Sequence, residues 1–88
     1  MAQTYRKEWN GTLIEVRNTA ERAELIIDGR TVDFVEGGKL VEGKNDYLQG
    51  YDGENHIEIR FTKINLIILS YIRIEFYYND RKIYKCNM

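Results

Sequence analysis

The stretch INLIILSYIRIEFYYND, residues 64–80, decides which kind of fold this chain can adopt. Its first half is a predominantly apolar run from Leu66 to Ile72, and the charged residues Arg73 and Glu75 follow closely. A membrane-spanning helix needs about 20 predominantly apolar residues, so this run is too short to form one. In the second half, apolar and polar residues alternate with period two, which is typical of a half-buried strand. The stretch therefore predicts a strand and not a membrane anchor.

The same alternation recurs elsewhere, and no long window shows a helical period. It is found in TLIEVR (12–17), AELIID (23–28), TVDFV (31–35) and HIEIRFT (56–62). In TVDFV, Val32 and Phe34 are predicted to share the face that meets the core. The sequence therefore predicts an all-β domain spanning residues 1–88, built as a small antiparallel β-sandwich or flattened barrel of about seven strands.

Two tight turns give the chain an internal repeat. LIIDGRTV (25–32) and FYYNDRKI (76–83) match in pattern, and a further alternating strand precedes each of them. Asp28-Gly29 suits a two-residue type I′ hairpin, in which both central residues need a positive φ. Asn79-Asp80 is a weaker version of the same signal, because Asn and Asp tolerate that conformation. We therefore hypothesise that the chain consists of two repeated hairpin units.

Two segments lack the strand pattern. Residues 1–10 are predicted to form a flexible N-terminus. Residues 36–55 hold five of the seven glycines and are predicted to form a long central loop, with a short strand at 39–41. A loop of this length is unusual in a small domain, and such loops often carry function.

The segments GTLIEVRNTAERAELIIDGRTVD, HIEIRF and YIRIEFYYNDRKIY span most of residues 11–84. Together they resemble the β-domain of the Fas apoptosis inhibitory molecule family. The resemblance implies an all-β cytosolic domain that has no catalytic site and makes protein–protein contacts. The second turn departs from the family pattern, since it reads Asn-Asp where the family has Asp-Gly. The resemblance transfers no functional residue to this chain.

The charge and the cysteine content limit which partners and which cell compartment we expect for this chain. The chain has 13 basic and 14 acidic residues, with a net charge of −1. Such a balance gives no long-range field toward nucleic acid or an anionic membrane, so neither is predicted as a partner. One cysteine excludes an internal disulfide, and the first residues hold no apolar core of a signal peptide. Both features predict a cytoplasmic protein.

The residues that usually carry catalysis are scarce. His56 and Cys86 are the sole histidine and cysteine, and the ends of chains, where Cys86 lies, are usually frayed. A zinc site needs about four ligands, which the chain does not supply. DGEN (52–55) lacks the register of a calcium loop, and Gly37-Gly38-Lys39 lacks the spacing of a phosphate loop. We therefore expect no enzyme activity, no cofactor and no metal.

The apolar run predicts where a partner binds. A strand over residues 66–69 would place apolar side chains on both faces, and a two-layer domain buries only one of them. Because large exposed apolar patches are uncommon on monomers, we expect a homodimer or another protein partner to cover the second face. The predicted interface consists of Leu66, Ile67, Leu69, Tyr71 and Tyr77.

The sequence therefore predicts a non-enzymatic protein–protein interaction module, such as a small inhibitor or adaptor. Frequent Ile, Tyr, Lys and Asn suggest a bacterium or one of its mobile elements as the source. The alternative hypothesis is a small-ligand-binding β domain, in which the central loop forms the mouth of the site. Its ligand residues would be Tyr47, Tyr51 and His56.

Overall fold

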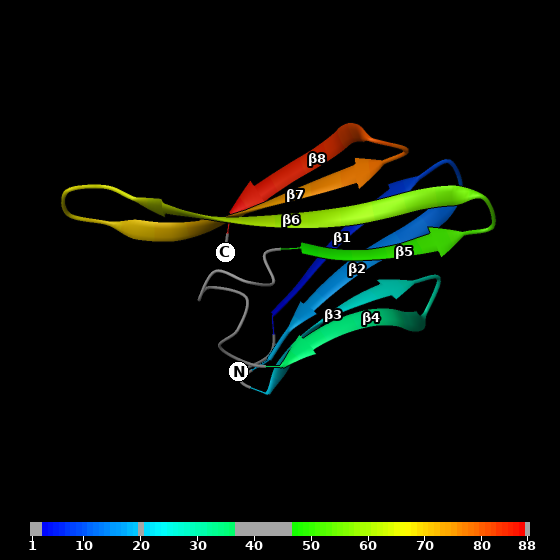
Figure 1. Ribbon diagram of the computed structural model, residues 1–88, viewed down its shortest axis with the longest axis horizontal. Helices are drawn as coiled ribbons and strands as arrows, with labels where there is room; N and C mark the ends of the chain where they lie inside the picture. The colour runs from blue at the N-terminus through cyan, green and yellow to red at the C-terminus, as the bar shows by residue number, and fades with distance from the viewer. Residues whose placement is uncertain (1–2, 20, 37–46, 88) are drawn as a thin grey trace.

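The alternating stretches form the strands of two antiparallel sheets (Figure 1). Their apolar faces meet in one layer between the sheets. The structure is a computed structural model, and it describes residues 3–19, 21–36 and 47–87. Eight strands are present in these ranges: β1 (Gln3–Trp9), β2 (Thr12–Asn18), β3 (Arg22–Ile27), β4 (Arg30–Glu36), β5 (Tyr47–Asp52), β6 (Asn55–Asn65), β7 (Ser70–Tyr78) and β8 (Arg81–Asn87).

Each sheet is a four-stranded meander, with the orders β1-β2-β3-β4 and β5-β6-β7-β8. The described residues contain no helix, so the predicted all-β sandwich is confirmed, with eight strands in place of about seven. The core takes six side chains from each sheet: Ile14, Val16, Ala23, Leu25, Ile27 and Val35 from the first, and Leu48, Ile57, Ile59, Phe61, Ile74 and Phe76 from the second. Their spacing is the period two that the sequence showed.

The two predicted turns have the same backbone geometry and the same hydrogen bonds. Asp28 and Gly29 have φ values of 49° and 81°, and Asn79 and Asp80 have values of 50° and 67°. Both pairs therefore fit the type I′ turn. The Asp28 carboxylate accepts a hydrogen bond from the Leu13 N–H at 2.8 Å, and the Asn79 side chain accepts one from the N–H of His56 at 2.8 Å. Each turn thus anchors the start of the strand that precedes its hairpin.

The repeat extends to the irregularities of the sheets. The register of β3 with β4 shifts after Leu25 and leaves Val32 without a partner opposite. The register of β7 with β8 shifts after Phe76 and leaves Ile83 without one. Both extra residues are half-buried and pack against the core. Since the two bulges occupy equivalent positions, the structure confirms the repeated hairpin units.

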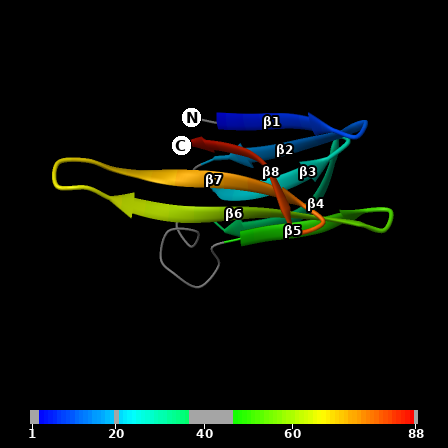
Figure 2. The same ribbon diagram turned by 90° about the horizontal axis from the view of Figure 1, so that it is seen from above.

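The two units differ in one hairpin. In the first unit, Asn18 pairs with Ala23 across four residues, whereas in the second Phe61 pairs with Ile74 across the twelve residues 62–73. The second hairpin is therefore eight residues longer. We call residues 62–73 the arm, and it extends beyond the other strands at one end of the sandwich (Figures 1 and 2).

Three sequence predictions are corrected. The segment 1–10 is not flexible throughout, because Gln3–Trp9 forms the edge strand β1, which pairs along its whole length with β2. The prediction of a loop over 36–55 is wrong for its second part, because Tyr47–Asp52 forms β5 and turns directly into β6. Residues 37–46, with the strand expected at 39–41, lie outside the described residues.

The third correction concerns β4. Phe34 does not face the core but is 49% exposed, and Val35 is buried in its place. The bulge at Val32 shifts the alternation of β4 by one residue, which explains the difference.

The two sheets approach closely where β4 meets β5. The Gln49 N–H donates a hydrogen bond to the Asp33 carboxylate at 2.9 Å, which links the two strands. A Cβ at Gly50 would lie 2.5 Å from Cγ2 of Val32, so only glycine fits beside this side chain. Near the other end of β5, the Thr12 hydroxyl donates a hydrogen bond to Asp52 and joins the sheets a second time.

We predict that Gly29→Val destabilises the protein by more than ~1 kcal/mol, because a β-branched residue resists a positive φ. Gly29→Asn is the matched control and should cost much less, since Asn tolerates this conformation. Chemical denaturation of both variants measures the two free energies of unfolding. Equal stability of wild type and Gly29→Val would contradict the assigned turn.

We also predict that Gly50→Ala costs about 1–3 kcal/mol, because its methyl group overlaps Val32, whose branched side chain is stiff. The double variant Gly50→Ala/Val32→Ala should lose less free energy of unfolding than the sum of the losses in the two single variants. A double-mutant cycle in urea measures this coupling. Strict additivity would show that the two residues do not meet.

Candidate functional site

The most exposed apolar side chains lie at the end of the arm. Leu66, Ile67, Ile68 and Leu69, here called the apolar tip, connect β6 to β7 and are 56%, 102%, 96% and 56% exposed. They form a turn, closed by a hydrogen bond from the Leu66 N–H to the Leu69 carbonyl at 2.6 Å. The prediction that they form a strand is therefore wrong. The idea that their side chains lie outside the core is consistent with the structure.

The arm offers more than its tip. Ile64 and Tyr71 are paired across the hairpin, so they share one face, and both are half-buried. Among the described strands, none pairs with the outer edge of β6 beyond Arg60, and none with that of β7 before Arg73. The arm is thus a two-stranded ribbon with an apolar end. Its charged residues are Lys63 and Arg73, and residues 61–74 contain no carboxylate.

A second surface lies on the outer face of the second sheet. Tyr47, Tyr51, His56, Arg60 and Tyr77 come from β5, β6 and β7, and we call them the tyrosine face. Directly opposed residues share a face, and the register pairs Tyr47 with Arg60 and Tyr51 with His56. All five point away from the core because they alternate with the buried residues of their strands.

The tyrosine face is held by aromatic and charged contacts. The Tyr51 and His56 rings lie 5.0 Å apart between centroids, and the Arg60 guanidinium lies 4.1 Å from the centre of the Tyr77 ring. Arg60 also pairs with Glu58, and this hydrogen bond raises the pKa of the arginine. Nearby, Lys82 donates a hydrogen bond to Glu75 at 2.9 Å, which raises the pKa of Lys82. Cations and carboxylates thus neutralise each other locally.

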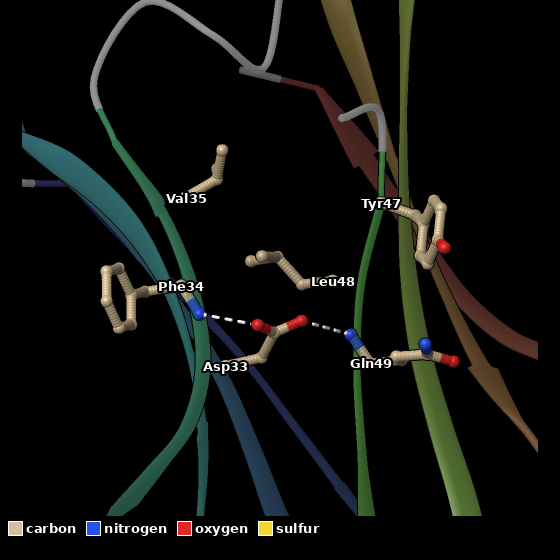
Figure 3. A pocket seen from close by; sticks show the side chains of 6 residues that line it. All are labelled: Asp33, Phe34, Val35, Tyr47, Leu48 and Gln49. Carbon is tan, nitrogen blue, oxygen red and sulfur yellow. Dashed lines mark hydrogen bonds between the residues drawn. The ribbon is translucent and has the colours of Figure 1, made fainter. Parts of the chain in front are cut away.

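A shallow pocket lies at the seam of β4 and β5 (Figure 3). Its volume is about 180 Å³, and it is lined by Asp33, Phe34, Val35, Tyr47, Leu48 and Gln49. The Asp33 carboxylate accepts hydrogen bonds from the N–H groups of Phe34 and Gln49, both at 2.9 Å, and the Phe34 ring points away. A second hollow of about 240 Å³ adjoins Tyr47 and Arg60. Both are smaller than the 300–1,000 Å³ that is usual for small-molecule sites.

Three side chains could together bind a metal ion. Ligand atoms of His56, Glu58 and Asp80 lie within 4.8 Å of one another. Sequence reasoning missed this group, because Asp80 belongs to a distant turn that the Asn79–His56 hydrogen bonds bring beside β6. All three are at least partly exposed, and Glu58 is paired with Arg60. The arrangement offers one imidazole and two carboxylates, the ligands that zinc and similar ions accept.

His56 and Cys86 do not form a catalytic pair. His56 is beside the β7–β8 turn, whereas Cys86 pairs with Ile74 near the base of the arm. His56 is level with Asn79 and Cys86 with Ile74, so the two positions are about five residues apart along β7, which is roughly 17 Å. Cys86 also lies in strand β8 and not in a frayed tail. It is half-buried against the core, and burial raises the pKa of its thiol.

The structure separates the residues of the predicted interface into two groups, and it places one of them beside the residues of the ligand hypothesis. Leu66, Ile67, Leu69 and Tyr71 stay together on the arm. Tyr77 lies on the body of the sheet, where it is opposite Glu58, and so joins Tyr47, Tyr51 and His56. The three residues of the ligand hypothesis lie together on the exposed face of the second sheet, where Tyr47 also borders the two shallow hollows. Whether the chain forms the expected homodimer stays a prediction.

Comparisons with protein-family models, with curated proteins and with solved structures returned no match for this chain. The resemblance to the Fas apoptosis inhibitory molecule family therefore stays an expectation. Among the described residues, no helix has the length and apolar character needed to cross a membrane.

We predict that Cys86 reacts slowly with iodoacetamide at about pH 8 in the folded protein, because the raised pKa leaves less thiolate. Unfolding in urea should speed the reaction several-fold, since it returns the thiol to its usual pKa. Mass spectrometry of the alkylated fraction over time measures both rates. Equal rates in the two states would contradict the burial of this side chain.

Proposed function

We propose that this chain is a non-enzymatic protein-binding module, with the sandwich as a rigid scaffold and the tyrosine face as the surface that contacts the partner. The observation that supports this most is the composition of that face. Three tyrosines and an arginine lie on neighbouring strands of one sheet, and Tyr47 and Tyr51 are 46% and 59% exposed. Tyr and Arg are enriched in protein interfaces and among the residues that dominate binding energy.

The shape and charge of the face favour a protein over other partners. The two hollows that described residues line near this face hold about 180 and 240 Å³, and each is smaller than an ordinary small-ligand site. Nucleic acid could stack on tyrosines, but Glu58 and Glu75 lie among the cations of this surface and would repel phosphates. A protein surface can match such mixed charges by complementary pairing.

The test is affinity purification from the native host, with the wild type and the Tyr47→Ala/Tyr51→Ala double variant as baits. We expect a protein to be retained by the wild type and its recovery to fall by about tenfold or more with the double variant. Phe34→Ala is the matched control, because Phe34 is a similarly exposed aromatic residue on the other sheet. It should retain the partner as the wild type does.

Two results would overturn the proposal. One is equal recovery with the wild type and the double variant, which would remove the tyrosine face from the contact. The other is a small molecule that raises the melting temperature of the wild type but not of the double variant, because a ligand that binds the native state stabilises it. That result would favour the ligand-binding alternative.

A further inference from the structure

The apolar tip is an isolated projection that the fold itself does not need. Ile67 and Ile68 are 102% and 96% exposed and therefore contribute nothing to the core. The arm that carries them is the eight-residue difference between the two repeated units. The turn also lacks Gly, Pro, Asn and Asp, the residues that tight turns commonly use. Four aliphatic residues at such a place require a partner that covers them.

The tip of a second copy of this chain is a poor cover. The four side chains expose on the order of 500 Å², so contact between two tips buries at most about 1,000 Å². Specific and stable interfaces bury about 1,200–2,000 Å². Such a contact also brings Lys63 and Arg73 of both copies together, with no carboxylate in residues 61–74 to offset them. Both the area and the charge oppose an interface made by the arms alone.

The local charge differs in sign from that of the whole chain. Residues 61–74 carry Lys63 and Arg73 and have a charge of +2, which leaves −3 for the rest of a chain whose net charge is −1. The expectation that no anionic surface attracts this protein rested on the net charge. The arm presents two cations with apolar side chains beyond them. A partner that complements both features must be anionic at its surface and apolar beneath it.

We infer that the apolar tip of the arm docks into the interfacial region of an anionic lipid bilayer. A bilayer covers apolar side chains without a shaped pocket, so it accepts a narrow, convex tip. Lys63 and Arg73, set back from the tip along the two strands, lie at the level of the lipid phosphates. Tyr71 lies between the tip and Arg73 and faces the headgroup region, where tyrosine is favoured.

The docking is shallow and peripheral. Asn65 and Ser70 pair directly behind the tip and are exposed, so the polar part of the arm begins there. The Leu66–Leu69 hydrogen bond satisfies one backbone donor and one acceptor inside the tip, which lowers the cost of placing a turn among lipids. The sandwich does not enter the bilayer, because the arm extends beyond its other strands (Figure 2). This inference goes beyond the proposed protein contact, which uses a different surface.

The experiment is co-sedimentation of the full chain with unilamellar vesicles of phosphatidylcholine alone or mixed with phosphatidylglycerol. Three double variants, each with a net charge of −3, make the comparison independent of total charge. They are Ile67→Asp/Ile68→Asp in the tip, Lys63→Gln/Arg73→Gln in the arm, and Arg30→Gln/Arg81→Gln as the control. The control residues are exposed and belong to the two type I′ hairpins of the body.

We expect the wild type and the control to sediment with the mixed vesicles. The tip and arm variants should bind at least about tenfold more weakly, since each basic residue near an anionic surface and each aliphatic side chain adds to the affinity. Because Ile67 and Ile68 touch nothing in the core, the melting temperature of the tip variant should equal that of the wild type. A wild type that stays in the supernatant, or a tip variant that sediments like it, overturns the inference.

A second measurement places the tip directly. Ile68→Trp adds a fluorophore at the tip, whereas the native Trp9 ends β1 beside its turn with β2. Mixed vesicles should shift the added emission to the blue, and lipids brominated on the acyl chains should quench it. Light scattering without lipid tests the competing explanation, in which a second copy of the chain covers the tip. A wild-type dimer that Ile67→Asp/Ile68→Asp dissociates, with no quenching by lipid, assigns the tip to a second copy and overturns the inference.

Discussion

The fold depends on a single apolar layer that two sheets must share. Each meander has one apolar face and cannot bury it alone, so the twelve core side chains, six from each sheet, become buried when the sheets pack together. A chain of 88 residues has enough apolar side chains for one such layer and few to spare. The outer face of the second sheet and the end of the arm take no part in this layer, and they carry the surfaces that we assign to partners.

The two repeated units form their hairpins and position their strands in the same way. Asp28 and Asn79 occupy equivalent turns and hold equivalent strand starts, and each unit has its bulge at the same place. Against this background, the arm is a departure from the repeat that adds exposed apolar residues to one unit. An extension that adds little burial and much exposed aliphatic surface is better explained by binding than by stability.

Alternation and the two turn signals predicted β2, β3, β4, β6, β7 and β8, whereas β1 and β5 were missed, for a physical reason. β2, β3, β6 and β7 alternate because one face of each meets the core, and their alternation was recognised. β1 reads QTYRKEW, an edge strand with little apolar surface, so its alternation is weak. β5 is interrupted by Gly50, which is needed for the approach of Val32 and not for a loop. The turn at Asn10-Gly11, with φ values of 50° and 77°, was a readable signal that marked the end of β1.

The candidate site was harder to predict than the fold. Periodicity cannot separate a buried strand from an apolar turn, so residues 66–69 were assigned to a strand. Their exposure is the outstanding feature of the arm, and their role in an interface stays a prediction. The tyrosine face and the His56–Glu58–Asp80 group are assembled from separate strands and turns, and their proximity follows from register, which single-sequence patterns do not specify.

Removal of the arm tests the account most directly, since the arm is described as an addition to a scaffold that is complete without it. Residues 62–73 can be replaced by the four residues 19–22, which connect the equivalent positions of the first unit. Ile72 is the one residue of the replaced segment that packs against the core, and it is only partly buried. We therefore expect the shortened chain to fold cooperatively in urea, with a loss of at most about 2 kcal/mol. A shortened chain that fails to fold would contradict the account and would assign the arm to the core.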